Sequence, residues 1–256
     1  MRTLRLVVIT WWLQLKMRSR SSFDGFLSIV YPLFFATTVF LMYREGGDPQ
    51  ALVVAAVGAA CMGVWSAVST TAAITLQAER RQGTLELLVA APTRFWLTVV
   101  PATISMATIG LWSLVATLVW GRVAFGIPVS FDQPLVFVLA ALVLAFSLGL
   151  VGFLQAVTSV RYRSAWAIGS VFEFPVWLIC GFLVPLSLLP SWVAPIAYVL
   201  PPTWGVAAVR DAALGGNPWP DMGLCLLTGA VYAVIGVVLA RRLVDSARER
   251  ATLALT

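Results

Sequence analysis

The sequence has no histidine, a single lysine and three cysteines among its 256 residues, and only 11% of its residues are charged. Without histidine, the commonest general base of hydrolytic enzymes is missing. A phosphate-binding loop of the form G-x-x-x-x-G-K-[S/T] needs its lysine on the phosphates. Lys16 lies instead in the run Leu-Gln-Leu-Lys-Met-Arg. The chain therefore cannot form that ATP site alone, and we predict no catalytic residue and no bound cofactor.

Cys61, Cys180 and Cys225 each lie singly inside a different apolar run. An odd number of isolated cysteines argues against a disulfide framework and against a metal site. Acidic residues outside one short segment are likewise scattered singly. We therefore predict no metal site.

Long apolar runs dominate what is present. The chain is 60% hydrophobic with a mean hydropathy of +0.93, far above the range of soluble domains. A run of about 18 apolar residues can cross a membrane as a helix. Six runs approach or exceed that length: 26–43, 51–76, 95–119, 135–160, 166–186 and 222–240. These runs predict an all-α integral membrane protein with six transmembrane helices, forming a single transmembrane domain over residues 1–256.

The basic residues are distributed unevenly between alternate connections. Of the 17 Lys and Arg residues, only Arg44, Arg122 and Arg210 fall in the second, fourth and sixth non-spanning segments. The positive-inside rule then predicts that both termini and the 77–94 loop lie on the cytosolic side of a plasma (inner) membrane. This distribution explains the net charge of +6 without any nucleic-acid partner. The predominance of Arg over Lys also suggests a GC-rich, and hence bacterial, genome.

Two further segments are apolar but are not predicted to span. Residues 2–20 carry Trp11 and Trp12 among apolar positions at helical spacing, with cations between them. This pattern is typical of an amphipathic helix in the membrane interface, in contact with lipids; the alternative is a disordered basic tail. Residues 188–210 contain four prolines, which interrupt helical hydrogen bonding. We predict two short re-entrant helices there, dipping into the outer leaflet; the alternative is one kinked full span.

The most informative stretch is a charged island, residues 79–92, between the second and third apolar runs. Its sequence begins Glu-Arg-Arg-Gln-Gly-Thr-Leu-Glu. Leu85, Leu88 and Val89 share one helical face, and the charged residues are available to a soluble partner. Gly83 would permit a turn or a close backbone approach, and Pro92 ends the segment. From the residues alone, a solvated connector remains an equal alternative.

The pattern Glu-Arg-x-x-Gly-Thr-Leu-Glu-x-Leu-x-x-x-Pro, present over residues 79–92, resembles the signature of membrane (permease) subunits of type-2 ATP-binding-cassette (ABC-2) exporters. Residues 181–185, 189–192 and 201–204, followed by Arg210, are similar to that family's fifth span and outer re-entrant helices. The resemblance covers essentially the whole chain. It implies that residues 79–92 form a cytosolic coupling helix.

The resemblance also implies the partners and the activity. A separate ABC ATPase subunit would bind ATP and Mg, and a second permease would complete a homodimer or heterodimer. The cargo would be amphipathic: a drug-like compound, a lipid or a lipid-linked glycan. The residues that would contact the ATPase are Glu79, Arg80, Arg81, Gly83, Thr84 and Glu86.

Glu173 is the one acidic residue clearly inside a predicted span. An ionisable group at that depth suggests a function in transport. The alternative is a neutral carboxyl group hydrogen-bonded to Ser170, Trp177 or a neighbouring helix. Trp65, Trp112 and Trp177 also lie within spans and are candidates for the substrate path, with core packing as their alternative.

Two other classes of membrane protein would require different features in the sequence. A secondary transporter coupled to ions or protons would use Glu173, but such proteins usually carry paired repeats, and none is visible here. A membrane enzyme or scaffold would need a catalytic constellation or a soluble domain. The sequence offers neither.

Overall fold

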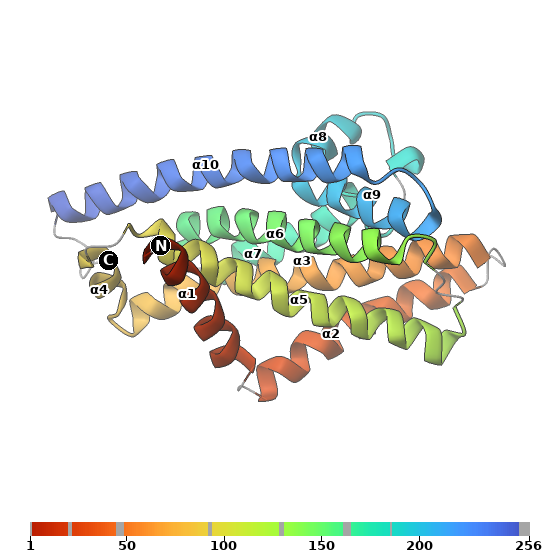
Figure 1. Ribbon diagram of the computed structural model, residues 1–256, viewed down its shortest axis with the longest axis horizontal. Coiled ribbons are helices and arrows are strands. Elements are labelled where there is room, and N and C mark those ends of the chain that lie inside the picture. The colour runs from red at the N-terminus through yellow and green to blue at the C-terminus, as the bar shows by residue number, and fades with distance from the viewer. Residues whose placement is uncertain are drawn as a thin grey trace.

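The computed structural model describes residues 2–19, 22–44, 49–91, 94–127, 131–160, 165–184 and 186–250. Every regular element in these ranges is helical (Figure 1). The elements are α1 (Arg2–Ser19), α2 (Ser22–Arg44), α3 (Pro49–Arg81), α4 (Leu85–Ala90), α5 (Trp96–Phe125), α6 (Pro134–Ser159), α7 (Ala165–Ile179), the 3-10 helix η1 (Leu186–Leu188), α8 (Ala194–Val199), α9 (Pro201–Leu214) and α10 (Trp219–Arg250).

The long helices α3, α5, α6 and α10 run along the longest axis of the molecule (Figure 1). Helix α3 lies at the centre and packs against α2, α5, α6, α7 and α9. Its apolar stretch Gln50–Ala72 is 72% buried, whereas that of α10, Trp219–Asp245, is 22% buried. Helix α10 therefore lies at the edge of the bundle, with a large apolar surface uncovered.

Among the described residues, four helical segments are long and apolar enough to cross a membrane: Gln50–Ala72, Trp96–Phe125, Pro134–Ser159 and Trp219–Asp245. The apolar stretch Pro32–Tyr43 of α2 is shorter. Helix α7 has 15 residues, or roughly 22 Å at 1.5 Å per residue, which is less than the hydrocarbon thickness of about 30 Å. The all-helical prediction is confirmed, whereas the count of six spans stays a prediction.

The segment 79–92 is not one continuous helix. Helix α3 extends through Glu79 to Arg81, and the three residues 82–84 then separate it from α4. The break occurs at Gly83, whose φ of 71° is left-handed and cannot continue a right-handed helix. Pro92, the predicted end of the segment, lies outside the described residues.

Helix α7 ends at Ile179, earlier than the apolar run predicts, and the chain turns at Gly181. Beyond η1, α8 and α9 follow each other, both with Pro in their first turn. Proline is tolerated there because the first N–H groups of a helix have no intrahelical partner. Helix α9 continues to Leu214 and packs on α6 and α10.

Helix α1 lies against α5. The indole Nε1 of Trp11 donates a hydrogen bond to Thr108 Oγ1 on α5, at 3.2 Å. Leu4, Val8 and Trp12 of the same helix remain exposed. Apolar side chains that the bundle leaves exposed are suited to contact with lipid.

Candidate functional site

The chain turns between α3 and α4, and residues of the charged island make the hydrogen bonds of this turn. The backbone N–H of Thr84 donates to the carbonyl oxygen of Glu79 at 3.0 Å, and the N–H of Gly83 donates to that of Arg80 at 3.2 Å. The Thr84 hydroxyl donates to the Glu79 carboxylate. This carboxylate therefore stabilises the turn, rather than only facing solvent.

Helix α4 is held on the bundle by the buried Leu85, and Leu88 packs against the same cluster. Leu85 is 2% exposed and packs in a cluster with Leu76 of α3, Phe95 before α5, Val157 of α6 and Val244 of α10. Burying a leucine contributes about 1.5–3 kcal/mol. The six-residue helix, too short to be stable by itself, is thereby fixed in place against four other parts of the chain.

Arg80 links this turn to the C-terminal end of α6. Its Nη1 donates a hydrogen bond to the carbonyl oxygen of Val160, at 3.2 Å. Val160 caps the C-terminus of α6, where carbonyl groups lack intrahelical partners and a cation is favourable. A displacement of the α3–α4 turn would therefore act directly on the end of α6.

Other parts of the segment face outward. Gln82 and Gly83 are exposed, and Leu87 is 70% exposed on the side of α4 away from Leu85. Leu87 therefore lies on the face of α4 that the rest of the described bundle leaves uncovered. Arg81 ends α3 and Glu86 lies in α4; their side chains fall outside the described part of the structure.

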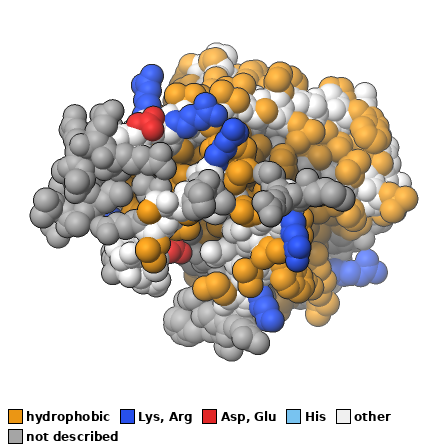
Figure 2. All heavy atoms as spheres, turned by 60° about the vertical axis from the view of Figure 1, so that its left-hand side comes forward, with side chains coloured by type: hydrophobic (Ala, Val, Ile, Leu, Met, Phe, Trp, Pro, Cys, Tyr) orange, Lys and Arg blue, Asp and Glu red, His pale blue; other side chains and the backbone are white. Residues whose placement is uncertain are grey.

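Basic side chains gather at this end of the bundle. Figure 2 shows the α4 end turned forward, where Lys and Arg outnumber Asp and Glu. Arg5, Lys16, Arg94, Arg241 and Arg242 are the exposed cations of the described residues that belong to the expected cytosolic segments.

Glu173 lies on α7 and is 2% exposed. Ser66 of α3 donates its hydroxyl hydrogen bond to Glu173 Oε1. The carboxyl group is therefore satisfied by a neighbouring helix. It joins α3 and α7, two helices already in contact.

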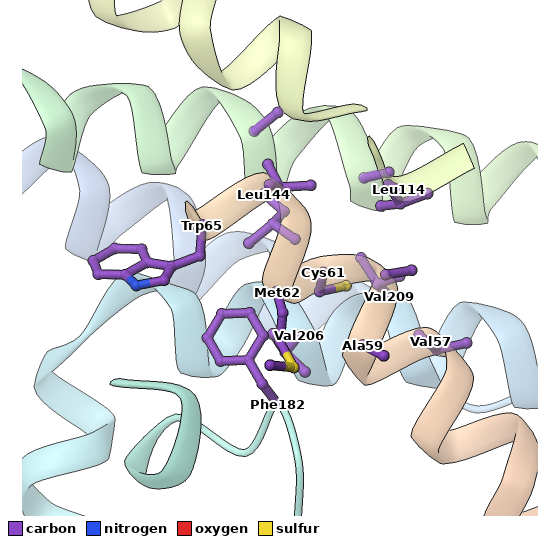
Figure 3. Close-up of a cluster of buried hydrophobic side chains, with 14 of the residues drawn as sticks. Val57, Ala59, Cys61, Met62, Trp65, Leu114, Leu144, Phe182, Val206 and Val209 are labelled. Atoms are coloured by element: carbon purple, nitrogen blue, oxygen red, sulfur yellow. The ribbon is translucent and has the colours of Figure 1, made fainter. Parts of the chain in front are cut away.

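The three candidate tryptophans do not form one site. Trp177 lies one turn from Glu173, and its ring makes edge-to-face contacts with Phe35 at 5.0 Å and Phe174 at 5.2 Å between centroids. Trp65 is 2% exposed among buried apolar residues of the core (Figure 3). Trp112 is 68% exposed on α5. The structure thus separates Trp112 from the two buried rings.

Both buried indoles lack a polar partner. Among the described residues, neither Trp65 Nε1 nor Trp177 Nε1 has a hydrogen-bond acceptor. Buried indole N–H groups usually find one. Trp177 and Glu173 therefore place an unused donor and a carboxyl group on neighbouring positions of one helix face.

Sequence reasoning missed the partners of the site residues. For Glu173 the sequence suggested Ser170, Trp177 or a neighbouring helix as hydrogen-bond partners without singling out Ser66, and nothing marked Val160 as the acceptor for Arg80. Both bonds join positions at least 80 residues apart. A single sequence carries no signal for such a pairing.

The described residues contain no group of His, Cys, Asp and Glu suited to hold a metal ion. The arrangement is that of a helical membrane bundle with a charged turn held in place at one end and an acidic residue between two helices. A search of curated proteins finds no match to the chain. The family model described as ABC-2 type transporter matches residues 5–214, which is most of the chain. The chain therefore belongs to the ABC-2 type transporter family, as a membrane permease domain that lacks an ATPase site of its own.

Proposed function

We propose that this chain is the permease subunit of an exporter that moves an amphipathic cargo, namely a drug-like compound, a lipid or a lipid-linked glycan. In ABC-2 transporters ATP binds to a separate ATPase subunit, and the permeases typically pair with such a subunit. The permease would work as a homodimer or with a second, similar permease. Helices α2 and α7 would complete six spans, with both termini on the cytosolic side of a bacterial plasma membrane.

One observation carries the proposal: the α3–α4 turn is built as a rigid contact element at the basic end of the bundle. Leu85 anchors α4, the Thr84–Glu79 bond closes the turn, and Arg80 ties it to α6. A mere connector would need none of these bonds. A turn that must transmit force from a docked ATPase needs all of them, since a flexible element would absorb the motion instead.

Within this proposal the six candidate residues divide into two groups. Glu79, Arg80 and Thr84 hold the turn in shape, and Gly83 lets the chain reverse. Arg81 and Glu86, together with the exposed Leu87, would face the ATPase. Charge pairs at such an interface would set its register and specificity.

Glu173 supports a role of the α3–α7 pair in the cargo path. The rings of Phe35, Phe174 and Trp177 would provide apolar contact beside a carboxyl group. The same buried acid is also the feature that favours the second candidate function, an ion- or proton-coupled secondary transporter. ATP dependence of transport separates the two.

Co-purification from the native host tests the proposal. The tagged wild-type chain is extracted gently beside a Glu79→Ala/Glu86→Ala double variant. Asp132→Asn serves as a control, because Asp132 is exposed just before α6, at the end opposite α4. We expect an ATP-binding-cassette ATPase with wild type and control, and much less with the double variant.

Two results would count against the proposal. An ATPase retained equally by all three chains would place the contact outside residues 79–92. No ATPase with a folded, transport-active wild-type chain would favour the secondary transporter.

A further inference from the structure

The turn that follows α7 is bonded to two other helices through adjacent carbonyl groups. Tyr43, near the end of α2, donates its hydroxyl hydrogen bond to the carbonyl oxygen of Leu183 at 3.0 Å. Arg210 of α9 donates from Nη2 to the carbonyl oxygen of Phe182 at 2.9 Å. Backbone carbonyls of a turn have no helical partner, so these two side chains satisfy them.

Helix α3 touches the same carbonyl directly. A Cβ atom placed on Gly58 would lie 1.9 Å from the oxygen of Phe182 and 2.6 Å from Nη2 of Arg210. Only glycine allows this approach. The Phe182 ring is fully buried among Met62 of α3 and Val206 of α9 (Figure 3). Four parts of the chain therefore meet at one turn, which we call the outer clamp: Tyr43, Gly58, residues 181–184 and Arg210.

The clamp contains the positive charge of Arg210, and few groups around it compensate for its removal from water. The Nε of Arg210 is shielded from solvent and has no hydrogen-bond partner among the described residues. Within the same part of the chain, the bond of its guanidinium is to a carbonyl oxygen rather than to a carboxylate. Burial of a charged group is costly unless it is paired. A bond network satisfied only in part is easier to open than a fully paired one.

The position of the clamp along α3 can be given relative to the bond between Ser66 and Glu173. Ser66 bonds Glu173 eight residues along α3 from Gly58, which is roughly 12 Å at 1.5 Å per residue. Helix α7 is thus fastened to α3 at its middle and again just beyond its end. Since α7 begins near the α4 end, where α6 finishes, the clamp closes the end of the α3–α7 contact farthest from the α3–α4 turn.

We propose that Arg210 and Tyr43 are positioning residues of an outer gate: their bonds to Phe182 and Leu183 hold the end of α7 closed against α3, and release of this clamp lets cargo leave. The inference rests on the proposed export function. It adds the place where the path closes and the two side chains that close it. Neither residue needs to touch the cargo.

The rates at which two native cysteines react show whether the clamp is closed or open. Cys61 lies one turn from Gly58 on α3, and Cys180 immediately precedes the turn; both are 0% exposed. Cys225, on α10, is equally buried and serves as the internal reference. The full chain in native membranes is treated with N-ethylmaleimide, and labelling of each cysteine is followed by peptide mass spectrometry. No cysteine has to be introduced.

The variants are Arg210→Gln, Tyr43→Phe and the conservative Arg210→Lys. We expect about tenfold faster labelling of Cys61 and Cys180 in Arg210→Gln, because a hydrogen bond from a charged group is lost. Tyr43→Phe, which removes one oxygen atom, should give a smaller increase at the same two cysteines. Arg210→Lys should restore slow labelling, and Cys225 should be unchanged throughout.

A second arm uses the complex with its ATPase subunit. A non-hydrolysable ATP analogue should speed labelling of Cys61 and Cys180 in wild type, and should add little in the clamp variants. Wild-type labelling rates in both Arg210→Gln and Tyr43→Phe would overturn the clamp. Faster labelling in the variants without any response to nucleotide in wild type would overturn the gate.

A misfolded variant would differ from an opened clamp in its pattern of cysteine labelling. If all three cysteines label faster in Arg210→Gln, Tyr43→Phe decides, and an unchanged rate there refutes the clamp. Failure of the proposed function would show differently, as absence of an ATPase in the co-purification. That result does not depend on any labelling rate.

Discussion

Gly83 offers a quantitative test of the α3–α4 turn. Its φ of 71° is left-handed, and a Cβ atom placed there would meet nothing within 4 Å. Gly83→Ala therefore adds backbone strain without a steric clash. A non-glycine residue in this conformation costs about 1–2 kcal/mol. Since about 1.4 kcal/mol is a tenfold change in an equilibrium constant, the equilibrium constant for forming the turn should fall roughly tenfold.

If the ATPase subunit docks only on the formed turn, its affinity for the permease depends on how much of the permease has the turn formed. Purified ATPase is titrated onto the permease in nanodiscs, and thermal unfolding of the permease is recorded beside it. We expect Gly83→Ala to weaken binding by up to about tenfold, the full factor applying where the unformed turn predominates in the variant. Gly83→Asn should bind within about twofold of wild type, because asparagine tolerates this conformation best among the other residues.

The control separates strain from the mere loss of glycine. Equal affinity of the alanine variant and wild type would show that the turn is not required for docking. Equal weakening by alanine and asparagine would show that a side chain at this position obstructs the partner, so that backbone strain is not the cause.

Three further predictions concern the rest of the bundle. Leu85→Ala should release α4 at a cost of about 2–5 kcal/mol for the cavity and lost burial, seen as faster proteolysis at the α3–α4 turn; unchanged cleavage would refute the anchoring role. Glu173→Gln keeps an acceptor for the Ser66 hydroxyl and should assemble normally but alter cargo transport, and normal transport at every pH tested would exclude a functional carboxyl group. Gly58→Ala should abolish stable expression, because its Cβ would overlap the carbonyl oxygen of Phe182. The matched variant Gly223→Ala, whose Cβ would meet nothing within 4 Å, should express like wild type.

The helical class and the family could be predicted from the sequence because both depend on local signals. Apolar runs long enough to span a membrane give helices, and residues 79–92 carry a motif with fixed spacing. The absence of a phosphate-binding loop agrees with a family in which ATP binds to a separate subunit. These features need no knowledge of which helix lies beside which.

The contacts that give the site its shape could not be predicted in this way. Thr84 precedes α4 as an N-cap, yet its hydroxyl bonds back to Glu79 and not to its own helix. Ser66 and Glu173 are 107 residues apart in sequence. Arg210, which the sequence marked only as an outer cation, turns inward to the carbonyl of Phe182. Each depends on tertiary packing, which a single sequence does not display.

Helix ends were predicted less well than helix existence. The apolar run 166–186 continues past the point where α7 stops, because hydrophobicity does not report the reversal at Gly181. In the same way, charge alone placed the start of the coupling segment at Glu79, although the last turn of α3 still includes this residue. Backbone conformation at single glycines decides both boundaries.

If the proposed function is right, α4 is the surface through which a separate ATPase acts on this permease. A photo-crosslinking amino acid at Leu87, which is 70% exposed on α4, tests it directly, with Leu135 as the matched control because it is 86% exposed at the start of α6. After irradiation of cells, we expect a cross-linked product with an ATP-binding-cassette subunit from position 87 and none from position 135. The same ATPase cross-linked equally from both positions, or an ATPase that co-purifies but never cross-links from position 87, would contradict it.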